Sequence, residues 1–404
     1  MVPDDAASPA AHLLTAEARA VLDRSTYGDW RALATADAVS LAFGFPYPAS
    51  FPTERLADAV EEVFRVEGES ALQYGGGEYA ERLEEFVVER AADRGIDPDE
   101  TAAMVTNGAT HAIDGVCRAF LDPGDVVVVE QPTFMGSLRV FKNFGVEILG
   151  APVDDDGLDV ASLGATLADR RAAGRPSPTL LYTIPNFQNP TGTTLPRRRR
   201  DRLLELAAEY DFAVLEDDAY GDLRYEGDPQ PPLAALDDAG RVIRVGTFAK
   251  TVAPGVRLGW LLADEPIRDA VRTLSAGGTN TFTRSVVGRY CDAGHLEDSL
   301  PHLRAAYERR RDRMLEALAD RMPDGTTWTE PDGGFFVWVE LPPGIDAEAM
   351  LEDAVDAGVT YLPGTMFYPD GDGGRCLRLS FSYVSPEEID EGIAALAETV
   401  GERL

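Results

Sequence analysis

Residues 241–260 read RVIRVGTFAKTVAPGVRLGW and carry both a structural and a chemical signal. The apolar start, VIRV, has the length and composition of a buried strand. Lys250 follows it and is one of only two lysines in 404 residues, the other being Lys142. A lysine amine can lose its proton and attack a carbonyl, which a guanidinium cannot do. The stretch therefore predicts a strand that ends near a nucleophilic lysine, although an ordinary strand-end lysine is the alternative interpretation.

Two further features of the sequence suit an anion. Thr247 and Arg257 flank Lys250 with a hydroxyl and a permanent cation, groups that bind phosphate. Gly108, followed by Ala109 and Thr110, ends a short strand and opens a helix, where exposed N–H groups attract negative charge. Many α/β proteins contain such a turn, so this second feature alone does not identify a ligand.

Composition narrows the class of protein. Acids outnumber bases 70 to 37, and the net charge of −33 is spread over the chain. Such a surface is typical of a saline cytosol and argues against nucleic acid as a partner. The three cysteines, Cys117, Cys291 and Cys376, lie far apart, so neither a disulfide framework nor a metal site is expected. No apolar run approaches membrane-spanning length, and we expect a cytoplasmic protein without a membrane partner.

A repeated order of strand, loop and helix predicts an α/β fold with a mostly parallel sheet between helices. Apolar strands are expected from residue 103 to the turn at Gly108, within 125–130, at 180–185, at 212–220, where the strand ends in acids, and at 242–245. A long helix at about 301–320 leads toward strands at 333–340 and 376–382. Because 404 residues exceed the size of a single core, we expect an arm at 1–48, a large domain at 49–290 and a smaller α+β domain at 291–404.

Functional side chains follow several of these strands. Asn189, Asp217 and Lys250 each come just after a strand, and a parallel sheet gathers such residues along one edge. Phe134 lies at the end of another strand, where packing in the core is the alternative interpretation. Arg378 interrupts the apolar run CLRLSFS, and an edge-strand residue facing water is its alternative.

Four motifs in this order resemble one family. They are NPTG at 189–192, EDDAY at 216–220, GTFAK at 246–250 with Arg257, and LRLSF at 377–381. The set is similar to the fold type I, class I/II aminotransferases that use pyridoxal 5′-phosphate (PLP), and the likeness runs from about residue 40 to the C-terminus. GFPYPASFP at 44–52 and IPNFQNPTG at 184–192 further resemble the subgroup of 2-aminoadipate aminotransferases and MocR-type regulator domains. The resemblance implies a sheet of the seven-stranded type.

The resemblance also implies how PLP is held. Lys250 would carry the cofactor and move the proton, and Asp217 would pair with the pyridine nitrogen. Tyr220 and Asn189 would bind the ring oxygen O3′, and Phe134 would stack on the ring. The implied phosphate ligands are Gly108, Ala109, Thr110, Thr247 and Arg257, with Tyr74 supplied by the neighbouring subunit of a homodimer.

The implied reaction moves the amino group of an L-amino acid to a 2-oxo acid, 2-oxoglutarate in particular, by ping-pong chemistry. Arg378 would clamp the substrate carboxylate, beside Asn189 and Gly44. Arg24 and Arg31 in the N-terminal arm are candidates for a second carboxylate. The turn QYGGGEY at 73–79 is shorter than the family often shows, which weakens the assignment of Tyr74.

Two other functions fit the same motifs. A PLP-dependent lyase or decarboxylase could use the same cofactor residues, because these residues do not determine the reaction. A MocR-type sensor would carry a DNA-binding domain, but only about 40 residues precede the family-like part, and they are not basic. We therefore expect the transferase, and the sequence leaves the amino donor open.

Overall fold

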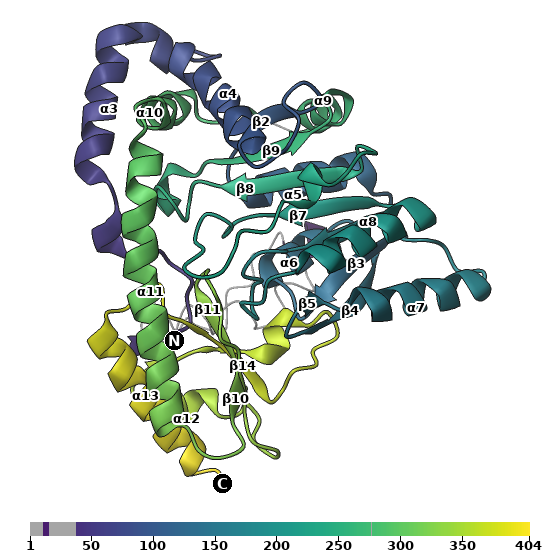
Figure 1. Cartoon of the computed structure of the whole chain (residues 1–404), viewed down its shortest axis with the longest axis vertical. Helices are drawn as coiled ribbons and strands as arrows, with labels where there is room; N and C mark the ends of the chain where they lie inside the picture. Colours follow the sequence, from purple (N-terminus) through teal and green to yellow (C-terminus); the bar gives the residue numbers. More distant parts are fainter. Residues whose placement is uncertain (1–10, 16–37, 276) are drawn as a thin grey trace.

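The computed structural model describes residues 11–15, 38–275 and 277–404. Its largest element is an eight-stranded sheet (Figure 1). In spatial order the strands are β2 (Ala102–Thr106), β9 (Gly259–Ala263), β8 (Val242–Thr247), β7 (Ala213–Asp217), β6 (Leu180–Thr183), β3 (Val126–Gln131), β4 (Glu147–Asp154) and β5 (Gly157–Leu158). Strands β8, β7, β6, β3 and β4 run parallel, β9 is antiparallel to both neighbours, and β5 is antiparallel to β4. The predicted α/β class is confirmed, and the two-residue β5 adds one strand to the seven expected.

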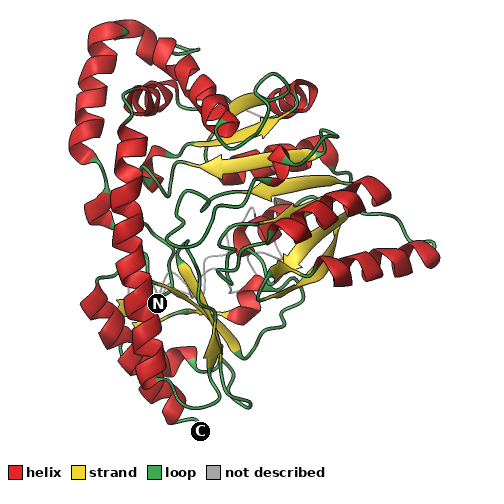
Figure 2. Ribbon diagram, viewed as in Figure 1, coloured by secondary structure: helices red, strands yellow, loops and turns green. Residues whose placement is uncertain are grey.

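Helices cover both faces of this sheet (Figure 2). They include α5 (Ala109–Phe120), α6 (Met135–Lys142), α7 (Val160–Ala172) and α8 (Arg197–Tyr210). Along β3, Val127 and Val129 pack in one hydrophobic cluster with α5 and α6, whereas Val128 packs in another with α7 and α8. Successive strand residues point to opposite faces, so a run of valines buries both faces.

A third group of helices packs beside β2 and β9. It comprises α3 (Thr53–Val66), α4 (Glu78–Ala92), α9 (Glu265–Leu274) and α10 (Thr281–Asp292). Val105 of β2 and Leu262 of β9 share a hydrophobic cluster with residues of α3, α4 and α10.

A second, four-stranded sheet lies below the large one in Figure 1. Its elements are β10 (Thr327–Trp328), β11 (Phe336–Glu340), β14 (Cys376–Ser380) and β13 (Leu362–Pro363), accompanied by α12 (Leu351–Asp356) and α13 (Pro386–Gly401). Strand β1 (Val39–Ser40) pairs in parallel with β12 (Val359–Thr360), so residues 39–40 are attached to the C-terminal part of the chain. One hydrophobic cluster contains residues of both sheets, such as Val129 and Leu379. The boundaries at 48 and 290 remain a prediction.

Helix α11 (His295–Arg321) runs along both halves of the molecule (Figure 1). The sequence predicted a start near Pro301, but the helix begins six residues earlier with Pro301 inside it. Leu296 and Leu300 are buried and extend the apolar face of the helix toward its N-terminus. The free energy gained by burying them offsets the cost of the backbone hydrogen bond that Pro301 cannot make. Among the described residues, no helix is long and apolar enough to cross a membrane. Within the same ranges, no group of three or more His, Cys, Asp or Glu is arranged to hold a metal ion.

Candidate active site

The sheet topology brings the predicted residues to one edge. Strands β6, β7 and β8 are parallel neighbours, so their carboxyl ends point the same way. Asn189 lies in the loop after β6, Asp217 ends β7, and Lys250 lies three residues beyond β8. Ligands of open α/β sheets bind at this edge.

The Lys250 amine contacts a backbone carbonyl and an aromatic ring, with two arginines and one aspartate nearby. Its Nζ donates a hydrogen bond to the Gly44 carbonyl oxygen at 2.9 Å and lies 5.6 Å from the centroid of the Phe335 ring. Burial lowers the pKa of Lys250 to about 8, with Arg378 and Arg257 adding to the shift and Asp217 opposing it. An amine with this pKa is partly neutral near pH 7 to 8, as a nucleophile or proton carrier requires.

Asp217 has one carboxylate oxygen without a partner. Its Oδ2 accepts a hydrogen bond from the Tyr182 hydroxyl at 2.7 Å, while the buried Oδ1 has no partner among the described residues. Burial raises the pKa of Asp217 to about 6, although the bond from Tyr182 lowers it. Since a buried unpaired acceptor is unfavourable, Oδ1 indicates a place for a donor from a ligand.

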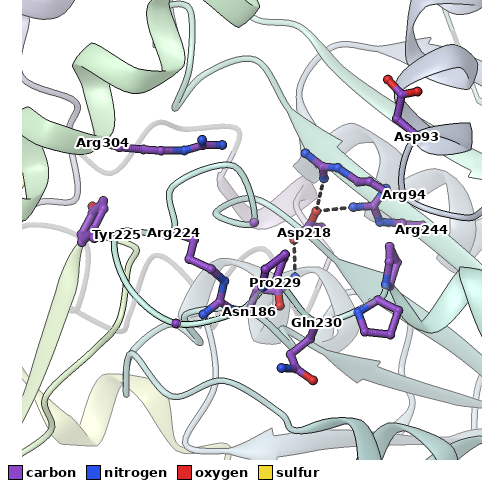
Figure 3. A pocket seen from close by; sticks show the side chains of 14 residues that line it. Asp93, Arg94, Asn186, Asp218, Arg224, Tyr225, Pro229, Gln230, Arg244 and Arg304 are labelled. Atoms are coloured by element: carbon purple, nitrogen blue, oxygen red, sulfur yellow. Dashed lines mark hydrogen bonds and ion pairs between the residues drawn. The ribbon is translucent and has the colours of Figure 1, made fainter.

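The adjacent Asp218 is engaged by protein groups in a separate cavity (Figure 3). Its Oδ1 accepts from Asn186 Nδ2 at 2.9 Å, and its Oδ2 accepts from Arg94 Nη1 at 3.3 Å and from Arg244 Nη2. Burial disfavours the charge, but Arg244 and Arg94 outweigh it and lower the pKa of Asp218. Of the two aspartates in EDDAY, only Asp217 therefore has an oxygen free for a ligand.

Arg378 on β14 is buried without an acid partner. Its Nη1 donates to Asn189 Oδ1 at 2.9 Å and its Nη2 to the Ala42 carbonyl oxygen at 2.6 Å. Its guanidinium carbon lies 4.0 Å from the centroid of the Phe336 ring, and its buried Nε has no partner among the described residues. Burial lowers the pKa of Arg378 to about 10. A buried cation held only by neutral groups is suited to an incoming carboxylate, and the alternative of a water-facing residue is wrong.

Tyr220 belongs to the same cluster. It is buried, and its ring centroid lies 5.5 Å from that of Phe335 and 5.7 Å from that of Phe336. Burial raises the pKa of Tyr220, while Arg378 and a hydrogen bond with Asn189 lower it. The tyrosine hydroxyl, the amide and the guanidinium are therefore neighbours.

The predicted phosphate residues meet at the start of α5. Gly108 precedes the helix with φ of 85°, and a Cβ built on it would lie 3.4 Å from Arg257 Nη2. A Cβ built on Gly259 would lie 2.6 Å from the Gly108 carbonyl carbon and 2.7 Å from the backbone nitrogen of Ala109, so this close approach requires glycine. Thr110 lies in the first turn of α5 and is exposed. Thr247 Oγ1 accepts from the Ala249 backbone N–H at 3.1 Å.

Three other predicted residues occupy different settings. Phe134 directly precedes α6 and packs partly buried against the core. Gly44 has no room for a side chain, because a Cβ would lie 2.5 Å from Phe336 Cζ. Tyr74 is 97% exposed in the turn before α4. Among the described residues of a single chain, it therefore does not belong to the cluster around Lys250. Arg24 and Arg31 lie outside the described residues.

The structure adds residues that the motifs did not indicate. Tyr182 contacts Asp217, and Phe335 and Phe336 pack around Lys250, Tyr220 and Arg378. A tyrosine inside the apolar strand LLYT was a usable signal, since a buried hydroxyl needs a partner. The paired phenylalanines of GGFF gave no comparable signal, because core packing explains such residues equally well.

A mostly parallel sheet with a partly buried lysine, a half-paired carboxylate and an arginine without an acid partner at one edge has the arrangement of a PLP-dependent enzyme of fold type I. The family model for aminotransferase class I and II matches residues 37–396. Aromatic-amino-acid aminotransferase 1 of Thermococcus litoralis is 42% identical over 377 residues, which cover 92% of this chain and 89% of that protein. The chain therefore belongs to the class I and II aminotransferases.

Solved structures agree with this assignment. Pyrococcus horikoshii kynurenine aminotransferase, in complex with PMP, KYN as substrates and KYA as products, matches with a TM-score of 0.89 and 42% identity over 98% of this chain and 97% of that one. The α-aminoadipate aminotransferase of Thermus thermophilus, complexed with N-(5′-phosphopyridoxyl)-L-leucine, matches with a TM-score of 0.82 and 34% identity over 91% and 92% of the two chains. The protein is a transaminase, and its cofactor is PLP.

The residues present fit this cofactor. The unpaired Asp217 Oδ1 can accept a hydrogen bond from a protonated pyridine nitrogen. Gly108 and Gly259 lie close together at the start of α5, beside Arg257, so the helix start and this cation can bind a phosphate. When bound, PLP supplies a ring that withdraws electrons from the substrate Cα. The lysine amine near its own pKa can hold a proton and return it.

Proposed function

We propose that this transaminase uses 2-oxoglutarate as its amino acceptor and that the residues gathered at the sheet edge perform the reaction. The observation that carries this proposal is that Asp217 and Arg378 both lie near enough to the Lys250 amine to act on its charge. Lys250 carries the cofactor and moves the proton, and Asp217 pairs with the ring nitrogen. Asn189 and Tyr220 bind the ring oxygen, while Phe134 stacks on the ring.

The remaining roles concern the two anionic ends of the ligands. Phosphate is bound by Gly108, Ala109, Thr110, Thr247 and Arg257. The substrate carboxylate is bound by Arg378, with Asn189 and Gly44 beside it. Because Arg378 has no acid partner, an amino acid and a 2-oxo acid can each supply the missing negative charge in turn.

We further propose that the amino donor has an aromatic or long apolar side chain. Phe45 directly follows the Gly44 carbonyl that Lys250 contacts, and its ring lies 6.0 Å from that of Tyr383. Both rings are partly exposed, at 49% and 40%, so they are accessible beside the site. The Thermococcus litoralis relative, an aromatic-amino-acid aminotransferase, supports this donor class, whereas the Thermus relative, an α-aminoadipate aminotransferase, supports 2-aminoadipate as the competing donor.

Amino transfer makes a stoichiometric prediction. The PLP-loaded enzyme with an L-amino acid alone should release about one equivalent of the matching 2-oxo acid per subunit and then stop, because the amino group has no acceptor. Adding 2-oxoglutarate should make release continuous, as measured by chromatography of the products. Tryptophan, phenylalanine, leucine and 2-aminoadipate would rank the donors.

The alternatives give different products in this experiment. Release of CO₂ would identify a decarboxylase, and release of ammonia a lyase. No release from any amino acid despite bound PLP would favour a sensor. A protein inactive with 2-oxoglutarate but active with another 2-oxo acid would contradict only the acceptor.

Arg378→Lys should lower kcat/KM for both the amino acid and the 2-oxo acid by roughly 10- to 100-fold. A lysine keeps the charge but loses the planar fork that binds a carboxylate through two hydrogen bonds. The kinetics of each half-reaction, with PLP binding followed separately, would check this. Arg403→Lys, which alters an exposed arginine paired with Asp353, is the control. An effect on only one of the two substrates would contradict a shared carboxylate site.

We propose that the enzyme is a homodimer in which Tyr74 reaches the phosphate of the partner subunit. Four exposed apolar residues lie between the last turn of α3 and the start of α4: Phe64, Val66, Leu72 and Tyr74. Exposed apolar groups in one segment are typical of an interface. The acid-rich surface also supports a saline cytosol as the location, where salt screens repulsion between subunits.

Leu72→Glu should convert the dimer to a monomer and weaken retention of PLP, because it places a charge in the proposed contact. Sedimentation in high salt with cofactor absorbance would measure both effects. Leu404→Glu changes an equally exposed leucine at the C-terminus and should have neither effect. Lowering the salt concentration should shift the unmodified protein from dimer toward monomer, because repulsion between the acidic subunits is then less screened. A parent protein that is monomeric and fully active at high salt would exclude the shared site.

A further inference from the structure

The contact between Tyr182 and Asp217 is set by the register of the sheet. Tyr182 of β6 pairs with Leu215 of β7, and both belong to the same hydrophobic cluster. Residues two apart on a strand share a face, so Asp217 lies on the face that Tyr182 occupies, one step nearer the carboxyl edge. The tyrosine hydroxyl can therefore reach the carboxylate without leaving the core.

The contact between Tyr182 and Asp217 is shielded from solvent, and it involves only one of the two carboxylate oxygens. Tyr182 is 0% and Asp217 4% exposed, and only Oδ2 receives the hydroxyl. The other oxygen, Oδ1, is buried without a partner among the described residues. A carboxyl group can rotate about its bond to Cβ, and the hydrogen bond from Tyr182 to Oδ2 favours the rotamer that leaves Oδ1 without a partner.

The position of Tyr182 is itself supported from two sides. Its ring packs against Phe141 of α6 with 5.5 Å between the centroids. Ser137, also on α6 and fully buried, lies near the Tyr182 hydroxyl and donates its own hydroxyl to the Phe134 carbonyl oxygen at 2.7 Å. Phe141 and Ser137 of α6 therefore flank the Tyr182 side chain and limit its movement.

We propose that Tyr182 is a positioning residue that holds the Asp217 carboxylate with Oδ1 directed at the pyridine nitrogen of bound PLP. This inference rests on the proposed role of Asp217. Tyr182 acts only through the Asp217 carboxylate and does not itself touch the cofactor. Its hydrogen bond also favours the ionised form of Asp217, since it lowers a pKa that burial raises.

Tyr182→Phe should weaken PLP binding to the apoenzyme roughly 10- to 100-fold, the effect of losing one hydrogen bond to a charged group. Fluorescence titration of the apoenzyme measures this without reference to turnover. The variant should also need a higher pH to bind PLP, because the carboxylate loses a stabilising donor and its pKa rises. Tyr361→Phe is the matched control: Tyr361 is equally buried and donates to the Ala347 carbonyl oxygen at 2.6 Å, far along the chain from Asp217. It should lower the unfolding temperature without changing the PLP titration.

The same titration in a background of Asp217→Ala separates positioning from general packing. If Tyr182 acts through the carboxylate, Tyr182→Phe should have no further effect in that background. An equal loss in both backgrounds, or an unchanged titration and pH dependence in Tyr182→Phe, would overturn the inference. If the Asp217→Ala protein binds PLP as well as the parent, the proposed role of Asp217 fails instead.

Discussion

Lys250→Ala should lower transamination by at least roughly 100- to 10,000-fold, the range expected when a group that transfers the proton is lost. The effect should be larger than that of any other single replacement at the sheet edge, because the same amine also attaches the cofactor. The lowered pKa of about 8 supports both tasks, since an amine that is always protonated could do neither. Steady-state assays with excess PLP would measure the loss.

The chain offers a matched control for this experiment, because it contains only two lysines. Lys142 is exposed at the end of α6, and Lys142→Ala should leave the rate unchanged. Borohydride reduction of the PLP-loaded enzyme, followed by peptide mapping, should then label Lys250 alone. A label on Lys142, or full activity in Lys250→Ala, would refute the assignment of the catalytic lysine.

Asp217→Asn should have the second largest effect, lowering kcat by roughly 100- to 1,000-fold, as removal of one preorganised electrostatic partner does in other enzymes. An amide keeps the shape of the side chain but cannot keep the pyridine nitrogen protonated. The hydrogen bond from Tyr182 can persist to the amide oxygen. The loss therefore reports the charge of Asp217 rather than the packing around it.

The same replacement should raise the stability of the cofactor-free protein near neutral pH, by on the order of 1 kcal/mol. The folded-state pKa of about 6 lies above the ordinary value of 3.8, so the folded protein binds this proton more tightly than the unfolded chain. Stability from this group is thus complete below about pH 4 and lost as pH rises toward about 6. Urea unfolding of the apoprotein should show Asp217→Asn becoming more stable than the unmodified protein as the pH rises from about 4 to about 6.

Asp218→Asn provides the contrast, although it changes the adjacent residue. It leaves Arg244 and Arg94 without the carboxylate that both contact, and breaking a buried pair costs about 3–5 kcal/mol. Unfolding should therefore show a loss of stability at neutral pH where Asp217→Asn shows a gain. Equal destabilisation by the two variants would mean that Asp217 is a structural acid like its neighbour.

Much of the large sheet could be predicted from local sequence. The run VVVV at 126–129 and the strands before Asn189, Asp217 and Lys250 lie where the apolar pattern placed them, because a strand buried on both faces is apolar throughout. The start of α11 was predicted wrongly at Pro301. There the local preference of proline for a first turn was overridden by tertiary burial of Leu296 and Leu300.

The sequence by itself determined the family, five of the eight strands of the large sheet, and the residue types that the chemistry requires. These depend on local patterns and on short motifs whose spacing is visible in one dimension. The tertiary structure alone decided which of two adjacent aspartates has a free oxygen, which tyrosine holds it, and that Arg378 faces Asn189 across 189 residues rather than water. Those outcomes depend on sheet register and on burial, which arise from contacts between residues distant along the chain, and no local pattern encodes them.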